Sequence, residues 1–306
     1  MTEQGCQPER RFDIVTDAAS DLSLAYLAAH DVAVVPMRIR LGGQDLADDA
    51  DLFPAEFYER VASGKVQPTT SQPSPADVSR VYDKVIARGA KAILSVHVSG
   101  GLSETVSSAT TAARDANKRV PCRVFDTATA SAAEGLVVRA VVMERDRGAS
   151  LEEALERADE VASHALLYFV APSTSMYAAG RGFGLLARLS GSLPMLHVSK
   201  EGTVVRDALS PDLTDLTGRI ARIMSKTAAQ EGPLMYVEVA AGIPHLLEHL
   251  EKPLDTNEFE SRCVAVETAS PSVATHAGIG AVGIAFAPVR HLPVPNDAAS
   301  KGETHV

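Results

Sequence analysis

The chain has 306 residues, of which 45% are hydrophobic and 22% are charged, and its formal net charge is −10. This length favours two domains over one and allows a large buried core. The negative charge argues against binding to nucleic acid or to an anionic membrane surface. Tryptophan is absent and aromatic residues make up only 5%, which leaves little material for stacking on bases. We therefore expect no nucleic-acid partner.

Cysteine usage and the apolar runs indicate the compartment. Cys6, Cys122 and Cys263 are widely spaced and form no CxxC pair, which is typical of a reduced protein without a zinc knuckle. No run approaches the ~18 consecutive apolar residues of a membrane span, so we expect no integral membrane segment. Residues 1–11 are polar and lack the apolar centre of a signal peptide. We predict a cytoplasmic protein.

Strands and helices alternate through the first half of the chain. Strands are predicted over residues 12–16, 32–41, 92–98 and 122–126, and helices over residues 22–29, 74–89 and 103–117 and from residue 150 onward. The helix at Ser74 has a serine cap, a proline in its first position and an acid three residues after the cap, a typical helix start. This alternation predicts βαβ units and a parallel sheet.

The second half is less regular. Strands are predicted over residues 166–171, 193–198, 203–208, 234–239, 263–267 and 281–287, and helices over residues 173–189, 213–229 and 244–250. A Lys-Glu-Gly turn between the second and third of these strands predicts an antiparallel pair. We therefore predict an α/β protein of two α/β domains, with a mainly parallel sheet in residues 11–163 and a mixed sheet in residues 164–292. We expect residues 1–10 to be flexible and residues 293–306 to be a disordered tail.

A glycine- and serine-rich loop, Ser99 to Thr105, follows the most apolar predicted strand and leads into a helix. In an open parallel sheet, ligands bind beyond the carboxyl ends of the strands. A helix N-terminus at that place offers unpaired N–H groups and a partial positive charge to an anion. Because the loop contains no lysine or arginine, it suits a carboxylate better than a triphosphate. The alternative is a solvated turn with an ordinary serine cap.

Two other segments carry hydrogen-bonding groups. Residues 69–74 contain four hydroxyls and one amide, and a helix-capping loop is the simpler interpretation. His276 stands in a predicted loop beside glycines, where an imidazole can hydrogen-bond a carboxylate or act as an acid or base. A purely structural histidine is the alternative.

Two patterns match known motifs outside the context that those motifs need. Residues 278–283 fit G-x-G-x-x-G, but a β-like run follows them instead of the helix that a dinucleotide fingerprint requires. Residues 245–249 fit the H-x-x-E-H of zinc peptidases, but a catalytic zinc needs a third protein ligand and none is evident downstream. We therefore expect no nicotinamide site, no metal and no cofactor.

Taken in order, these segments resemble the motifs of the DegV family of two-domain bacterial lipid-binding proteins. The matching segments are residues 16–22 (T-D-A-A-S-D-L, similar to T-D-S-[ST]-A-D-L), 35–37 (V-P-M, similar to V-P-L), 70–74 (T-S-Q-P-S), 99–105 (similar to S-S-x-L-S-G-T), 180–182 (similar to the G-G-R-I turn) and 275–280 (T-H-A-G-I-G, similar to T-H-x-G-P-G). Their order covers about residues 12–290, nearly the whole chain.

The resemblance implies a long-chain fatty acid bound between two α/β domains. In the family, hydroxyls of the T-S-Q-P and S-S-x-L-S-G-T loops hold the carboxylate, and the histidine of T-H-x-G-P-G lies nearby. Carried over, the resemblance implies a head-group site formed by Thr70, Ser99, Gly100 and His276. The secondary candidates are Ser71, Ser103, Thr275, Arg181 and Arg206.

Several departures from the family motifs fall in the segments of the implied head-group site. Gly100 replaces a serine, which removes a hydroxyl but keeps a backbone N–H donor. Glu104 replaces a glycine, and its carboxylate either complements the dipole of the following helix or repels an anionic ligand. Ile279 replaces a proline. We therefore expect the shape of the site and its head-group preference to differ from those of the family.

The resemblance implies that the protein carries a fatty acid and presents it to a separate fatty acid kinase, or shuttles it, without catalysis of its own. One alternative is a serine-dependent acyl hydrolase or transferase that uses Ser99 or Ser103 with His276, although no G-x-S-x-G elbow is present. Another alternative is a regulatory module that has lost its ligand because of Glu104 and Gly100.

Overall fold

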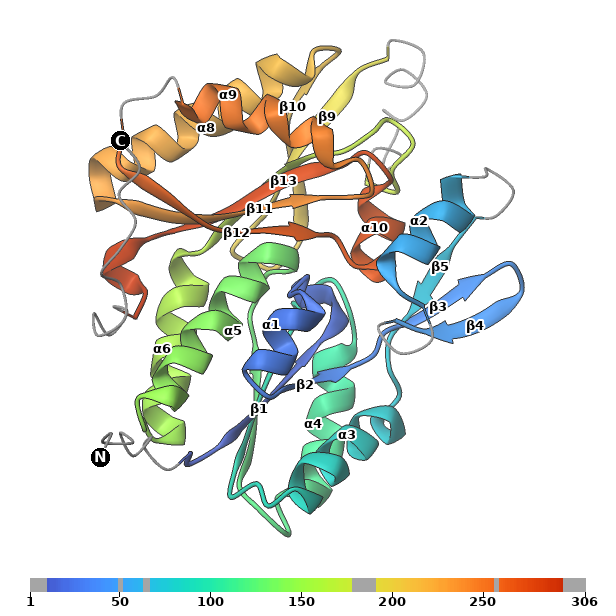
Figure 1. Cartoon of the computed structure of the whole chain (residues 1–306), viewed down its shortest axis with the longest axis vertical. Helices are drawn as coiled ribbons and strands as arrows, with labels where there is room; N and C mark the ends of the chain where they lie inside the picture. Colours follow the sequence, from blue (N-terminus) through green and yellow to red (C-terminus); the bar gives the residue numbers. More distant parts are fainter. Residues whose placement is uncertain (1–9, 49–51, 63–66, 178–190, 256–258, 294–306) are drawn as a thin grey trace, which may run out of the picture.

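The computed structural model describes residues 10–48, 52–62, 67–177, 191–255 and 259–293. Two sheets are stacked on each other through a layer of helices (Figure 1). The first sheet is parallel throughout and has the strand order β2–β1–β6–β7. Its strands are β1 (Asp13–Asp17), β2 (Val32–Val35), β6 (Ile93–His97) and β7 (Cys122–Asp126).

Helices cover both faces of the first sheet. On the outer face lie α3 (Pro75–Ala87) and α4 (Thr105–Ala116), and on the inner face lie α1 (Leu24–Ala29), α5 (Ser131–Asp146) and α6 (Leu151–His164). The predicted start of α3 is confirmed, because Ser74 and Asp77 form a reciprocal capping box with Pro75 in the first turn. Ser150 and Glu153 form the same arrangement at α6.

The second sheet is mixed and has the order β10–β9–β8–β13–β11–β12, with β11 and β12 as its parallel pair. Its strands are β8 (Leu166–Val170), β9 (Leu193–Val198), β10 (Val204–Ser210), β11 (Leu234–Ala240), β12 (Ser261–Thr268) and β13 (Val282–Pro288). Helices α8 (Leu213–Glu231) and α9 (Glu248–Asp255) lie on its outer face (Figure 1). The predicted fold class, α/β with one parallel and one mixed sheet, is confirmed.

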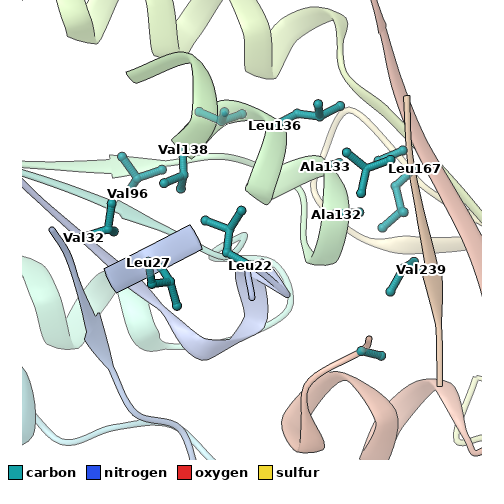
Figure 2. Close-up of a cluster of buried hydrophobic side chains, with 14 of the residues drawn as sticks. Leu22, Leu27, Val32, Val96, Ala132, Ala133, Leu136, Val138, Leu167 and Val239 are labelled. Carbon is teal, nitrogen blue, oxygen red and sulfur yellow. The ribbon is translucent and has the colours of Figure 1, made fainter. Parts of the chain in front are cut away.

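Helix α5 joins the two sheets into one core. Its side chains pack on both neighbours, and Figure 2 shows Ala133 beside Leu167 of the second sheet while Val138 lies near Val96 of the first. These residues are buried in a single cluster. Because α5 is buried on nearly all sides, it lacks the one-sided apolar periodicity that marks a surface helix, and the sequence analysis did not predict it.

The single strand predicted over residues 32–41 is wrong. It is divided into β2 and β3 (Arg38–Leu41), which belong to different sheets. The break falls at Pro36, which has no N–H to donate and therefore ends a strand ladder. Strand β3 forms a small antiparallel sheet with β4 (Gln44–Ala47) and β5 (Thr69–Ser71), so part of the predicted loop at residues 69–74 is a strand.

Several short elements complete the fold. They are α2 (Pro54–Ala62), α10 (Pro271–Ala277), and the 3-10 turns η1 (Ala18–Ser20), η2 (Pro244–Leu247) and η3 (Val289–His291). The predicted helix at residues 173–189, residues 1–9 of the N-terminus and residues 294–306 of the tail lie mostly or wholly outside the described residues. In the described part of the chain, no helix is both long and apolar enough to cross a membrane.

Candidate functional site

A cavity of about 570 Å³ lies between the two sheets, within the ~300–1,000 Å³ that is usual for ligand pockets. The first sheet contributes residues at the carboxyl ends of its strands, including Val98 and the loop at residues 100–104. The second sheet contributes its inner face, and β5 and α10 complete the lining. The fold therefore brings segments far apart in the sequence to one space at the carboxyl ends of the parallel strands, where ligand sites are expected in open parallel sheets.

The inner face of the second sheet forms an apolar wall. Leu167 and Phe169 of β8 and Val239 of β11 line it. Val239 lies opposite Gly283 in the antiparallel register of β11 and β13. A Cβ atom on Gly283 would come within 3.0 Å of Phe169 and 3.2 Å of Val239, so the wall is closely packed at this glycine and has no room for a side chain there. Such a wall favours an apolar ligand, because each buried methylene contributes ~0.8 kcal/mol.

A polar cluster forms a second part of the lining. Thr70 and Ser71 of β5, Ser103 of the loop before α4, and His276 of α10 all line the cavity. Thr70 Oγ1 lies 2.6 Å from His276 Nε2. Among the described lining residues there is no lysine or arginine, while Glu104 contributes a carboxylate. The cluster thus offers mostly neutral hydrogen-bonding groups.

Helix α10, which carries His276 in its last turn, is held by buried carboxylates from the first half of the chain. Asp21 Oδ1 accepts a hydrogen bond from the Ser270 N–H at 2.7 Å, and Asp48 Oδ2 accepts one from the Ser272 N–H at 2.9 Å. Both carboxylates satisfy N–H groups at the helix start, where negative charge is stabilised. The prediction that His276 lies in a loop is therefore wrong, and its position is set by contacts between the two halves of the chain.

Burial lowers the pKa of His276 below its ordinary value, because the charged imidazolium loses solvation. The ring is therefore neutral at neutral pH and offers one donor and one acceptor. One of these faces Thr70 Oγ1, as the 2.6 Å distance shows. A neutral histidine beside hydroxyl groups suits hydrogen bonding to a carboxyl group more than ion pairing.

Ser99 and Gly100 both make hydrogen bonds within the protein. Ser99 is not among the cavity-lining residues; its Oγ donates to the Gly202 carbonyl at 2.8 Å and accepts from the Gly101 N–H at 3.0 Å. Because Gly202 lies in the turn between β9 and β10, Ser99 ties the first loop to the second sheet. Gly100 does line the cavity, but its N–H donates to the Asp126 carboxylate at 3.1 Å and is already engaged.

The secondary candidates divide into two groups. Ser71 and Ser103 line the cavity. Thr275 does not, because its hydroxyl donates to a carbonyl one turn earlier in α10. Arg206 is exposed on β10 and is not among the lining residues, and Arg181 lies outside the described residues.

The serine hydroxyls named for a hydrolase mechanism have partners other than His276. Ser99 bonds to the turn between β9 and β10, and Ser103 Oγ lies 2.7 Å from Thr105 Oγ1. His276 itself is paired with Thr70. A hydrolase needs its nucleophile within hydrogen-bonding reach of the base, so this geometry does not favour the enzymatic alternative.

A serine–histidine–aspartate chain does occur in the core of the first sheet. Ser95 Oγ lies 2.7 Å from His97 Nε2, and His97 Nδ1 lies 2.9 Å from Asp17 Oδ2. All three side chains are fully buried, and the Tyr82 hydroxyl donates to Ser95. No substrate reaches them, so these groups cross-link β1, β6 and α3 as a satisfied buried network.

Several lining residues escaped the sequence analysis, including Gln72, Ser131 and Tyr177. Gln72 lies within the T-S-Q-P-S segment, and its position between Thr70 and the Ser74 cap could have identified it as a lining residue. Ser131 has a positive φ of 56° at the start of α5, and Tyr177 lies in the turn after β8. Neither of these two belongs to a sequence motif, because tertiary packing alone brings them to the cavity.

A buried carboxyl group on α5 leads to a prediction about stability. Glu134 is fully buried, accepts a hydrogen bond from Thr16 Oγ1 at 3.3 Å, and has no partner for its Oε2. Burial, with the nearby negative charges of Asp17 and Asp21, raises the pKa of Glu134 well above its ordinary value. Because of the raised pKa, the unfolded chain loses this proton at a lower pH than the folded protein does. The contribution of Glu134 to the free energy of unfolding is therefore fully present at low pH and is lost as the pH rises toward the pKa of the folded state.

The Glu134→Gln variant is therefore expected to be more stable than the wild type at pH 8 by at least about 1.4 kcal/mol, the free energy that corresponds to one unit of pKa shift. The gain should shrink toward zero near pH 4.5. Urea unfolding at pH 4.5, 6 and 8 checks this, with Glu152→Gln on the exposed surface of α6 as the matched control. A gain that is the same at all three pH values would contradict the explanation by ionisation.

The fold and the cavity define a two-domain α/β protein with a ligand cavity between its sheets, apolar on one side and hydrogen-bonding on another. Residues 11–289 match the model of the DegV family, described as uncharacterised proteins. A DegV domain-containing protein of Deinococcus radiodurans is 34% identical over 289 residues, which cover 90% of this chain and 98% of the relative. The chain belongs to the DegV family.

Solved structures agree with this assignment. A DegV family protein from Thermus thermophilus, described for its fatty acid binding, superimposes with a TM-score of 0.80 at 26% identity and covers 91% of this chain and 99% of its own. The DegV fatty acid binding protein of Bacillus subtilis has a TM-score of 0.74 at 21% identity, with coverage of 91% and 99%. The second likeness shows the fold alone.

Proposed function

We propose that this protein binds a long-chain fatty acid, with the acyl chain against the apolar wall and the head group at the polar cluster. The observation that carries the proposal is a single cavity in which an apolar sheet face adjoins neutral hydroxyl and imidazole groups. Cavities of this kind fix the orientation of an apolar ligand through a few convergent polar groups. Fatty acid binding by the related Thermus thermophilus protein supports the same ligand class.

In this proposal Thr70 and His276 make the principal contacts to the carboxyl group, assisted by Ser71 and Ser103. Their hydroxyls and neutral ring supply hydrogen bonds without a full positive charge. Gly100 borders the head group through its backbone. Ser99 acts indirectly, because its bond to Gly202 holds the loop against the second sheet.

We further propose that the protein is a carrier without catalysis, cofactor or metal of its own. It would present the bound fatty acid to a fatty acid kinase or shuttle it through the cytoplasm. Unpaired cysteines at Cys122 and Cys263 fit a reducing compartment. Arg181 and Arg206 are the candidates for contact with such a partner or with a phosphate group.

Native mass spectrometry of the purified protein tests the proposal, followed by organic extraction and identification of the released molecule. We expect one fatty acid per chain. Thr70→Val and His276→Ala should each weaken binding about 10-fold or more, because a hydrogen bond to a charged group contributes about 1.5–3 kcal/mol. Thr275→Val is the matched control, since it removes a hydroxyl that bonds within α10. Wild-type protein that remains empty after incubation with fatty acids would overturn the proposal.

A further inference from the structure

Glu104 places a carboxylate beside the polar cluster. It occupies the N-cap position of α4, yet its side chain makes no capping bond to the helix. Instead, Glu104 Oε2 accepts a hydrogen bond from Gln72 Nε2 at 2.9 Å, and both residues line the cavity. Gln72 follows Thr70 and Ser71 on the same chain segment, so the carboxylate is held next to the groups that contact the head group in the proposed function.

The charges around this carboxylate are not balanced from within the cavity. No lysine or arginine is found among the described lining residues, and burial keeps His276 neutral. The Asp126 carboxylate, which accepts from the Gly100 N–H, adds a second negative charge behind the loop. Glu104 itself is exposed. A negatively charged head group is therefore repelled, in proportion to its charge.

We infer that Glu104 is a specificity-determining residue that limits the negative charge of the head group this cavity accepts. The ligand class is then single-chain lipids whose head group is uncharged or singly charged, and lipids with a phosphate monoester are disfavoured. This inference rests on the proposed function, because it requires the head group to lie at the polar cluster.

Three ligands with the same 16-carbon chain test the inference: hexadecanol, hexadecanoate and hexadecyl phosphate, bound to delipidated full-length protein at pH 7.5 and 0.15 M salt. Glu104→Gln should leave hexadecanol affinity within two-fold of wild type. It should strengthen hexadecanoate binding about five-fold, which corresponds to like charges ~8 Å apart in a partly solvated site. For hexadecyl phosphate, whose head group carries a charge near −1.5 to −2, Glu104→Gln should strengthen binding more than about ten-fold.

Two variants serve as controls. Glu104→Asp keeps the charge and should keep the discrimination, whereas Glu152→Gln removes a charge from the exposed face of α6 and should change none of the three affinities. An equal change for all three ligands in Glu104→Gln would overturn the inference, because packing rather than charge would then be responsible. If the wild type bound none of the three ligands, the proposed function itself would fail, and this inference with it.

Discussion

The Val239→Phe variant is expected to bind hexadecanoate about 100-fold more weakly than the wild type while remaining folded. Val239 lines the apolar wall and faces Gly283 across the β11–β13 pair. The wall is closely packed around Gly283, so the larger phenyl ring at position 239 extends into the cavity that Val239 lines. The ring then occupies space needed by three or four methylenes, each worth ~0.8 kcal/mol, which gives about 3 kcal/mol in total.

The matched control is Val266→Phe, the same substitution on the neighbouring strand β12 at a position 58% exposed and outside the cavity lining. It should leave binding unchanged. Titration with fatty acids of 10, 12 and 16 carbons adds a second readout, because a shortened cavity penalises the longest chain most. Equal weakening at all three lengths would indicate general damage to the fold instead of a filled cavity.

Local signals were sufficient for the central part of the first sheet and for one of its helices. Residues 92–98 form a mostly apolar run, interrupted by Ser95 and His97, that contains β6, one of the two inner strands. The cap at Ser74 marked the start of α3 to the residue. A buried parallel strand and a capped helix are both specified by neighbours in sequence. The parallel topology follows from the alternation of such elements.

The unpredicted elements depend on contacts between distant segments. Helix α5 is buried between two sheets and therefore shows no polar face. Strand β5 is three residues long and is defined by pairing with β3, in which Ile39 pairs with Thr70 far along the chain. Neither feature is encoded in a local period, so the small sheet and the middle layer emerged only in the folded chain.

The same distinction applies to the candidate site. The motifs identified Thr70 and His276, and the structure brings their side chains into contact across 206 positions of sequence. The motif also named Ser99, whose hydroxyl is used to fasten the turn between β9 and β10. A hydroxyl in a loop is equally suited to a ligand or to a backbone carbonyl, and only the position of the second sheet decides between them.

The contact between Ser99 and Gly202 leads to the second large expected effect. Gly202→Ala should destabilise the protein by about 3 kcal/mol. Gly202 has φ of +72°, which costs a residue with a side chain about 1 kcal/mol or more. In addition, the new Cβ would overlap Ser99 Oγ and lie 3.3 Å from Ala128 Cα. Relieving the overlap breaks the Ser99–Gly202 hydrogen bond, worth about 1 kcal/mol, and moves the turn away from the loop.

Urea unfolding measures the loss, and Gly191→Ala separates its two causes. Gly191 has a similar φ of +66° but open space around the added Cβ. Gly191→Ala should therefore lower the free energy of unfolding only by the backbone cost of placing alanine at a positive φ. Ser99→Gly combined with Gly202→Ala removes the overlapping atoms and should recover part of the stability. Fatty acid binding should weaken along with stability, since Val198 and Val204 flank this turn and line the cavity. If Gly202→Ala lowered the free energy of unfolding no more than Gly191→Ala, the Ser99–Gly202 contact between the two sheets would contribute little to stability. The two sheets would then be held together around the cavity by the core at α5 instead.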